Sequence, residues 1–433
     1  MVYLLRGMNF CATHSNLFRL RHITLMEQNN KKIFIFLTGR NDWGLFKRRN
    51  ESLLLEISKR ETVEYAIHIE PITLLGFINL TIKLLKRENL KDENIRHIYK
   101  LHFKKALFPL PILADKKIYV YSLFVLYTGN NTILRKLSNL LIKLQGKIIN
   151  KKFNLSRRDI VLVVYPPSYY LLQAIKTIKH DMIIADLVDD VIERISDDKK
   201  KKFVEHYKNI LSMCDWVFST SPVHREAYGN YTKHEIEFLP NGVDVEEFSV
   251  GVPEELVKNN GRKTVGYVGY IGDTADMDLL EYIVSCNPNV TFYLIGPVAR
   301  NILEQVNKIV HQYKNCRYLG IRRHTEIVAY ISSFDVLINF KKADYRTRGN
   351  DCMKIYQYLA VGKPVVSTPI SPAERFKDII YVALDKFQFE KYLKQALEED
   401  NKEVMEKRIK TALQNSWKKR ADVILHRISE FGL

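Results

Sequence analysis

The sequence predicts an α/β protein made of two doubly wound, Rossmann-like domains in tandem. Three observations lead to this prediction. Continuous apolar runs of strand length alternate with amphipathic segments, which is typical of parallel sheets covered by helices on both faces. The chain has 433 residues, more than one ordinary core holds. A polar stretch with Gly and Pro, residues 241–262, separates two such alternations and is typical of a linker.

The first alternation lies in residues 31–240. The run KIFIFL at 32–37 predicts a buried first strand, because all of its central residues are apolar. The segment FVEHYKNILSM at 203–213 has the spacing of an amphipathic helix. The other strand candidates of this domain are 160–165, 182–188, 216–221 and 235–240.

One helical segment of this domain, residues 133–152, supports two interpretations. Its apolar residues, such as Leu137, Leu140 and Leu144, recur at helical spacing with lysines between them. A helix that packs these residues into the core is the commoner explanation. The alternative is a helix that docks on an anionic bilayer through its apolar and basic face.

The second alternation lies in residues 263–385, and we expect C-terminal helices over 386–433, with helical pattern throughout 386–426. Its strand candidates are 264–272, 290–296, 316–320, 334–340, 364–368 and 379–384, and its helix candidates are 276–284, 300–313, 324–332 and 351–361. Ligands of doubly wound sheets bind beyond the carboxyl ends of the strands, so we expect a cleft between the two domains to hold the site.

Composition narrows the class of protein. A formal charge of +18 favours anionic partners, but no RNA-recognition or zinc-finger motif accompanies it, so we expect no nucleic-acid partner. The five cysteines are scattered, which favours a reducing compartment and a cytoplasmic location. The longest apolar run, IYVYSLFVLY at 118–127, is too short to span a membrane. Residues 1–30 lack the compact apolar block of a signal peptide, and we expect them to lie outside the fold.

Four segments resemble GT-B glycosyltransferases, most closely the family-four type that builds bacterial surface polysaccharides, including the teichuronic-acid-type transferases. These segments are FLPNGVDVEEF (238–248), VGYVGYIG with the DMDLLEYIVSCNPNVTFYLIGP that follows it (265–297), FDVLINFK (334–341) and KIYQYLAVGKPVVST (354–368). The resemblance implies that the second domain binds a nucleotide-activated sugar and the first an acceptor. It also implies that the last helix crosses back to the first domain and that transfer retains the anomeric configuration.

A cation-rich loop in the second domain is the predicted donor site. A sugar that leaves a nucleotide diphosphate places negative charge on phosphate, which fixed cations and backbone N–H groups can stabilise. The loop KKADYRTRGNDC at 341–352 leads into a helix start, whose unpaired N–H groups and positive dipole end favour phosphate. The alternative is a set of ordinary exposed charges. The predicted donor-binding residues are Gly272, Lys341, Lys342, Arg346, Arg348, Asn350, Lys354 and Gln357.

We expect neither a metal ion nor any other cofactor; the nucleotide-diphosphate sugar is a substrate. The pair Asp276 and Asp278 has the letters of a metal-binding motif but stands at a predicted helix start, where acidic residues complement the dipole. The glycines Gly266, Gly269 and Gly272 are spaced unlike a dinucleotide fingerprint, and we expect Gly266 to serve close packing.

The sequence pattern for an acceptor site in the first domain is weaker than the pattern for the donor site. The loop TGRNDWGLFKRRN at 38–50 follows the first strand, and DLVDD at 186–190 ends another. An acidic residue there can act as a general base or as electrostatic support, and capping of a following helix is the alternative. The predicted catalytic residues are Asp190, Asp189 and Asp42, and the predicted acceptor-binding residues are Trp43, Arg48 and Asn50.

Two positions depart from the family pattern. Retaining family-four enzymes carry two glutamates eight positions apart, and here these positions are Gly349 and Gln357. We expect a transferase that moves a sugar to a surface glycan or lipid-linked acceptor, in contact with the inner face of the cell membrane. The alternatives are a catalytically inactive homologue that acts as a binding subunit and a nucleotide-sugar epimerase on the same fold.

Overall fold

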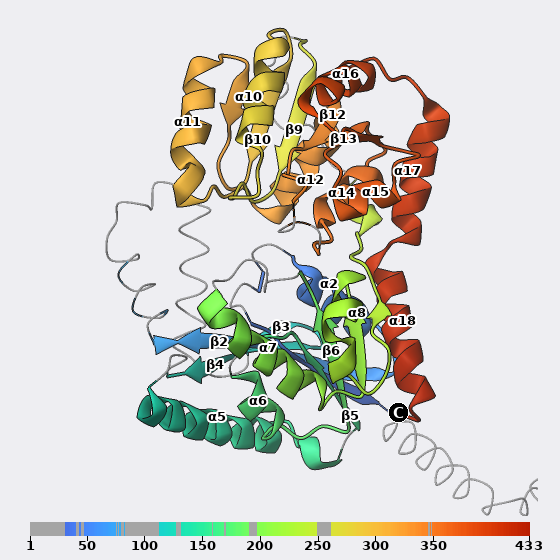
Figure 1. Cartoon of the computed structure of the whole chain (residues 1–433). Coiled ribbons are helices and arrows are strands. Elements are labelled where there is room, and N and C mark those ends of the chain that lie inside the picture. The colour runs from blue at the N-terminus through green and yellow to red at the C-terminus, as the bar shows by residue number, and fades with distance from the viewer. Residues whose placement is uncertain are drawn as a thin grey trace, which may run out of the picture.

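The structure is a computed structural model that describes most of the chain. The described residues are 31–39, 43–44, 47–74, 76, 78, 82, 112–126, 131–157, 159–168, 170–189, 197–248, 261–344, 347 and 349–433. They form two β-sheets with helices on both faces, one above the other in Figure 1, so the predicted two-sheet α/β fold is confirmed. Residues 1–30 lie outside the described part, and the predicted domain boundaries stay predictions.

The first sheet has eight strands in the order β3-β4-β2-β1-β5-β6-β7-β8. Neighbouring strands are parallel except for the antiparallel pair of β3 and β4. The strands are β1 (Lys32–Leu37), β2 (Val63–Thr73), β3 (Ile112–Asp115), β4 (Ile118–Val125), β5 (Asp159–Val164), β6 (Met182–Leu187), β7 (Trp216–Ser219) and β8 (Glu237–Phe238). Three strands, β2 to β4, were not predicted; β2 mixes His68, Glu70 and Pro71 with apolar residues, which hides the usual pattern.

Alternate residues of β1 enter two cores, as the pleat of a strand requires. Ile33, Ile35 and Leu37 face a cluster that α5, α6 and α7 cover, whereas Phe34 and Phe36 face one that α2 and α18 cover. The helices of this half are α2 (Arg49–Ser58), α5 (Thr132–Lys152), α6 (Leu171–Ile175), α7 (Asp197–Leu211) and α8 (Val223–Tyr228), with short 3-10 turns η2 (Leu155–Arg157) and η4 (Gly229–Tyr231). A further 3-10 turn, η5 (Val245–Phe248), lies in the link and packs against a core cluster of the second half. Both faces of the first sheet are therefore buried.

The second sheet has six parallel strands in the order β11-β10-β9-β12-β13-β14. They are β9 (Thr264–Val268), β10 (Thr291–Ile295), β11 (Cys316–Tyr318), β12 (Val336–Asn339), β13 (Val365–Ser367) and β14 (Tyr381–Val382). The helices of this half are α10 (Met277–Cys286), the turn η6 (Arg300–Ile302), α11 (Leu303–Gln312), α12 (His324–Ser333), α14 (Met353–Ala360), α15 (Ser371–Arg375), α16 (Lys386–Leu397) and α17 (Lys402–Gln414). Each predicted strand of this half is present, shortened by one or more residues.

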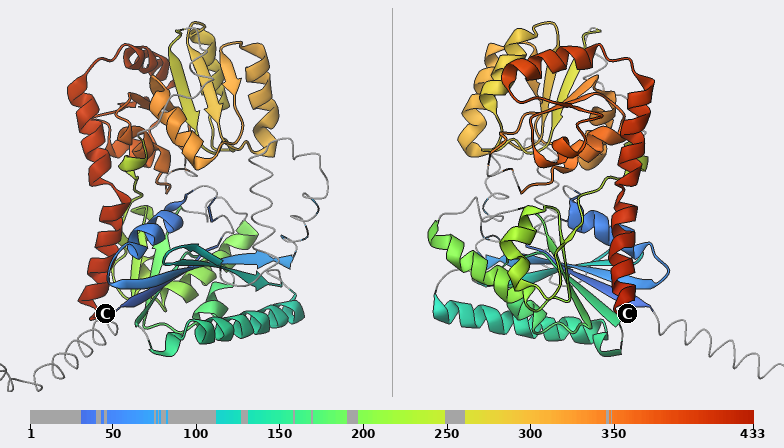
Figure 2. Two further views of the ribbon diagram at one scale, coloured as in Figure 1. Left: turned by 180° about the vertical axis from the view of Figure 1, so that it is seen from behind. Right: turned by 45° about the vertical axis from the view of Figure 1, so that its right-hand side comes forward.

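The prediction of helix throughout 386–426 was wrong in one respect. The C-terminal region forms three helices, α16, α17 and α18 (Trp417–Glu430), because Asn401 and Ser416 each begin a new helix as N-caps. α18 runs beside the first sheet (Figures 1 and 2) and buries Trp417, Ala421 and Ile424 there.

The two chain segments that connect the halves lie side by side. Val243 N donates to Asn415 O and Trp417 N donates to Val243 O, each at 3.1 Å. The Cα of Gly242 lies so near the Trp417 indole that an added Cβ would stand 3.0 Å from its ring. The link after the first sheet and the junction of α17 and α18 therefore form one connection between the halves.

Candidate functional site

The candidate donor site lies where the loops after β9 and β12 run together. Asp276 N donates to Phe340 O, and Lys342 N donates to Thr274 O, both at 2.8 Å. These bonds place Lys341 and Lys342 beside the loop that contains Gly272. The carboxyl ends of neighbouring parallel strands thus supply both loops, as the doubly wound topology requires.

Lys354, in the first turn of α14, is buried beneath these loops. Its Nζ lies 3.6 Å from the centroid of the Tyr267 ring, which belongs to β9. A Cβ built on Gly269, the residue after β9, would stand 2.9 Å from the same Nζ. Among the described residues, this amine has no hydrogen-bond partner.

The environment of Lys354 acts on its protonation. Burial, with a smaller contribution from the Lys341 charge, lowers the pKa of Lys354 to about 7. The face of the Tyr267 ring opposes this effect, because an aromatic face attracts a cation. A buried amine with no partner is costly unless an anion accompanies it, so this geometry favours a negatively charged ligand.

The N-terminus of α14 offers further groups to an anion. Cys352 is its N-cap residue, and no described side chain caps the backbone N–H groups of the first turn. Asn350, two residues earlier, is 7% exposed; its Oδ1 has no hydrogen-bond partner among the described residues, but as an acceptor it suits a hydroxyl donor rather than the anion itself. The side chain of Thr347 donates to Lys342 O at 2.7 Å and shapes the loop before it.

Asp351, also at this helix start, serves to join the two halves. Its carboxylate accepts hydrogen bonds from Asn241 N at 2.5 Å and from the Tyr356 hydroxyl at 2.9 Å, and it pairs with Arg375. Burial raises the pKa of Asp351, against the opposing effect of Arg375. Asn241 is 2% exposed, and this burial favours a role in the link between the halves over contact with a substrate.

Two glycine interpretations have different outcomes. Gly266 packs against Phe334, where an added Cβ would stand 2.0 Å from the ring, so its predicted packing role is confirmed. Gly272 lies beside the Tyr270 ring, where an added Cβ would stand 2.4 Å away. Gln357 is half-buried on α14, one turn after Lys354. Contact of Gly272 or Gln357 with a donor stays a prediction.

Several predicted site residues fall outside the described part of the chain. These residues are Arg346 and Arg348 of the donor set and Asp42 and Asp190 of the catalytic set. Their predicted roles stay predictions.

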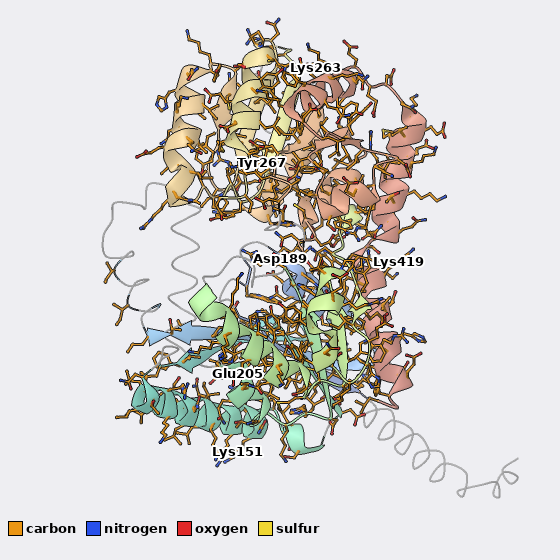
Figure 3. All side chains as sticks on the ribbon, viewed as in Figure 1. Lys151, Asp189, Glu205, Lys263, Tyr267 and Lys419 are labelled. Carbon is orange, nitrogen blue, oxygen red and sulfur yellow. The ribbon has the colours of Figure 1, made fainter. Side chains whose placement is uncertain are left out.

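On the first half, Asp189 lies two residues after the end of β6. Its backbone φ is +56°, a left-handed conformation that is uncommon for a residue other than glycine. Figure 3 places Asp189 at the side of the first half that faces the second half. Such backbone strain is concentrated at functional sites, which keeps Asp189 among the catalytic candidates.

Trp43 is buried rather than open to an acceptor. Its indole is 9% exposed and lies 4.7 Å from the His68 ring, centroid to centroid, and its backbone N–H donates to Glu70 Oε1 at 2.6 Å. Arg48 and Asn50 are half-buried at the start of α2. The burial of Trp43 favours packing, and the acceptor role of all three residues stays a prediction.

The sequence reasoning missed a buried ion pair on this half. Arg49 Nε donates to Asp186 Oδ2 at 2.7 Å, and each side chain is 2% exposed. Burial disfavours the charged guanidinium, but the Asp186 carboxylate beside it raises the pKa of Arg49. Arg49 also donates to Pro240 O at 3.0 Å, at the start of the link between the halves. No local signal in the sequence pairs these two residues, which lie 137 positions apart.

The acidic pair after β9 behaves as predicted for a helix start. Asp276 is the N-cap of α10, and its Oδ1 accepts from Leu279 N at 3.0 Å. Within the described ranges, no group of three or more His, Cys, Asp or Glu side chains is placed to hold a metal ion. The same ranges contain no helix with the length and apolar character to cross a membrane.

Comparison with solved structures identifies the architecture. A sucrose-phosphate synthase from Thermosynechococcus elongatus superimposes with a TM-score of 0.64, at 12% identity, over 93% of this chain and 99% of that one. The fold is GT-B. The Anabaena protein HepE in complex with UDP and glucose gives 0.61, at 14% identity, over 92% and 99%. A UDP-forming trehalose-phosphate synthase from Burkholderia vietnamiensis gives 0.60, at 12% identity, over 92% and 99%.

Sequence comparison adds one relative to this GT-B architecture. No protein-family model matches the chain. A Bacillus subtilis protein, TuaH, is 24% identical to this chain over 196 residues. TuaH is provisionally named as a teichuronic acid biosynthesis glycosyltransferase. The match covers 43% of this chain and 49% of that protein, so the chain spans about half the length of this curated relative. The resemblance to GT-B glycosyltransferases therefore holds in both fold and sequence.

Proposed function

We propose that the chain is a glycosyltransferase that transfers a sugar from a nucleotide-diphosphate donor to a surface glycan or lipid-linked acceptor. The observation that carries this proposal is the buried Lys354 amine, which has no hydrogen-bond partner among the described residues and lies between the Tyr267 ring and Gly269. A diphosphate beside this amine supplies the missing counter-charge. The structural neighbours include proteins in complex with UDP or UDP-glucose, which supports a uridine nucleotide as the donor.

The chemistry follows from the charge that develops on the leaving group. As the glycosidic bond to phosphate breaks, negative charge grows on the diphosphate oxygens. Lys354, Lys341 and the first-turn N–H groups of α14 are fixed before the reaction and stabilise that charge without reorganisation. This arrangement supports transfer without a metal ion, and the family resemblance supports retention of configuration.

A second candidate is an inactive homologue that binds the nucleotide sugar. Two residues favour it: Gly349 offers no side chain to the donor sugar, and Gln357 replaces a carboxylate with an amide. An amide still forms hydrogen bonds with a ribose diol, although without the strength of a charged acceptor. Binding would then persist while chemistry is lost.

A thermal-shift screen against UDP-, GDP-, ADP- and CDP-sugars tests the proposal. We expect one nucleotide class to raise the unfolding temperature of the wild type, and this shift to disappear in Lys354→Ala. NMR analysis of incubations with the selected donor then separates the candidates. Released sugar or a glycoside identifies a transferase, an unchanged donor identifies the inactive homologue, and a changed sugar epimer identifies an epimerase.

A further inference from the structure

Helix α5 turns its apolar stripe toward solvent. The predicted core packing of Leu137, Leu140, Leu144 and Ile148 is wrong, since they are 47%, 54%, 49% and 56% exposed. Ile133, in the first turn, is 72% exposed. With a helical period of 3.6 residues, these five positions fall on one side of the helix. The stripe therefore faces away from the protein.

The opposite side of α5 is firmly attached to the first half. Ile142 and Ile149 are fully buried in the cluster beneath β1, and Gly146 lies against Thr177. Gln145 exchanges two hydrogen bonds of 2.8 Å with the backbone of Phe124 on β4. These contacts fix the rotation of the helix about its axis, so the exposure of the stripe is a property of the fold.

The exposed side of α5 is also basic. The helix contains no Asp or Glu. Five exposed lysines stand on it, namely Lys136, Lys143, Lys147, Lys151 and Lys152. Lys136, Lys143 and Lys147 flank the apolar stripe on one side, as the helical period places them. Figure 3 labels Lys151 at the outer surface of the molecule, and Figure 2 shows α5 on the side of the first sheet remote from the second sheet.

We propose that this face of α5 docks on the surface of an anionic lipid bilayer, with the apolar stripe in the headgroup region and the lysines beside lipid phosphates. A 21-residue helix with an apolar stripe and a lysine-rich flank matches the pattern of helices that lie in a membrane interface. Charge decides between a bilayer and a second copy of the chain. Two such helices face to face would bring like charges together, whereas an anionic surface attracts every lysine.

The docking face is separate from the donor site. α5 lies on the far side of the first sheet, whereas Lys354 and the loops around it belong to the second sheet (Figure 1). The proposal is therefore independent of the proposed transfer reaction, and donor binding serves as a readout of folding that a docking variant leaves unchanged.

Vesicle co-sedimentation of the full chain tests the proposal. The probes are phosphatidylcholine vesicles with and without phosphatidylglycerol, at low and at high salt. We expect binding only to the vesicles that contain phosphatidylglycerol, with release at high salt, because salt screens the lysine charges. The double variant Leu140→Gln, Lys143→Gln should bind at least about fivefold more weakly, since one lysine at an anionic surface contributes about that factor.

A matched variant controls for the substitution itself. Lys410→Gln, Leu413→Gln on α17 changes the same two residue types at the same spacing, and Leu413 is 51% exposed. This variant should bind vesicles like the wild type. Equal binding by both double variants would overturn the proposal, as would failure of the wild type to sediment with anionic vesicles. Self-association of the wild type that the α5 variant abolishes would identify a second copy as the occupant and likewise overturn it.

Discussion

Lys354 is the residue on which the donor site depends. Its amine is buried without a partner among the described residues, between the Tyr267 ring and the backbone of Gly269. Its neighbours Ile355 and Tyr356 are fully buried, so the first turn of α14 cannot rotate to expose the amine. A group held in this way is prepared for an anion that arrives from the loop side.

Replacing Lys354 with Met should abolish the counter-charge while preserving the volume of the side chain. We expect at least about thirtyfold weaker binding of UDP-glucose, because removal of one member of a buried charge pair costs 2 kcal/mol or more. Isothermal titration calorimetry measures this change. Lys410→Met, at an exposed position of α17, provides the control and should bind like the wild type. Equal affinities of the two variants would contradict the assignment.

Donor affinity should also depend on pH. The pKa of Lys354 without ligand is about 7, below its ordinary value, so the amine loses its proton as pH rises through 7. A diphosphate favours the charged amine, and binding above pH 7 therefore requires proton uptake. The affinity for UDP-glucose should fall by up to about tenfold per pH unit above 7, and the Lys354→Met variant should lose this dependence.

UDP-glucose suits this titration, because its diphosphate has no group that titrates near neutrality. An affinity that is constant from about pH 6 to pH 9 would argue against Lys354 as the ligand.

The lowered pKa of Lys354 makes donor affinity fall with rising pH, but it makes the stability of the fold rise. Between pH 7 and the ordinary lysine value of 10.5, the unfolded chain binds the Lys354 proton and the folded chain does not. Stability therefore rises with pH in that window, by the linkage between proton binding and folding. Urea denaturation of the wild type and Lys354→Met across this range measures it. We expect Lys354→Met, which buries no amine, to be more stable than the wild type at pH 7, and this advantage to shrink as pH rises. An advantage independent of pH would show that the folded amine keeps its proton throughout, as a paired amine does.

At the scale of elements, α14 combines two tasks at one helix start. Its first turn carries Lys354 toward the loops after β9 and β12, while Asp351 just before it ties the helix to the link between the halves. The helix ends at Ala360, and Gly362, whose φ of +69° suits glycine, then reverses the chain into β13. The site is thus positioned by the same helix start that is bonded to the link between the halves.

Asp351→Ala should destabilise this connection strongly. The substitution leaves the buried donors of Asn241 and Tyr356, and the partly exposed Arg375 guanidinium, without their acceptor. Each buried donor left unsatisfied costs about 1–3 kcal/mol. Asp351→Asn keeps an acceptor oxygen and should cost less. Urea denaturation followed by tryptophan fluorescence measures both variants. Equal stability of Asp351→Ala and the wild type would show that the carboxylate does not hold the halves together.

The sequence predicted elements better than it predicted contacts. Apolar runs such as 32–37 mark the strands that lie in the interior of a sheet, and most of the helices and strands of the second half were predicted from them. The sequence did not predict β2, because its polar residues do not mark an exposed face. His68 and Glu70 are each 0% exposed, so both are buried within the sheet. The sequence left open whether the stripe of α5 faces the core or solvent, because periodicity reports that a stripe exists and not which side of it meets the core.

In the candidate site, too, local features could be predicted from the sequence and long-range contacts could not. The loop 341–352 and Lys354 could be predicted, because a cation cluster before a helix start has a direct electrostatic meaning. The pairing of Arg49 with Asp186 could not, since these residues lie 137 positions apart and only the sheet order brings them together. The burial of Trp43 depends likewise on His68 of the neighbouring strand β2.

At the scale of the whole molecule, two connections join the halves and lie in contact. The link at Val243 bonds to the junction of α17 and α18, and α18 then packs against the first sheet. A third contact joins Glu247 to Lys47 of the first half and to His324 of α12, whose Nε2 lies 2.8 Å from Glu247 Oε2. The link, α18 and Glu247 therefore all contribute contacts between the halves.

Trp417→Ala tests the role of α18 in this connection. The indole is 4% exposed and packs in the cluster of the first sheet, so its truncation should cost about 3–5 kcal/mol. Phe387→Ala on α16 is the matched control, because that ring is 65% exposed, and it should change stability by less than about 0.5 kcal/mol. Chemical denaturation compares the two. A loss for Trp417→Ala no larger than that of the control would mean that α18 contributes little to the first half.

A crystal structure of the chain grown with UDP tests the central claim most directly. The account predicts diphosphate oxygens within hydrogen-bond distance of Lys354 Nζ and of the first N–H groups of α14, beside Lys341. A nucleotide bound elsewhere, or a Lys354 amine that a protein side chain already pairs in the presence of UDP, would contradict it.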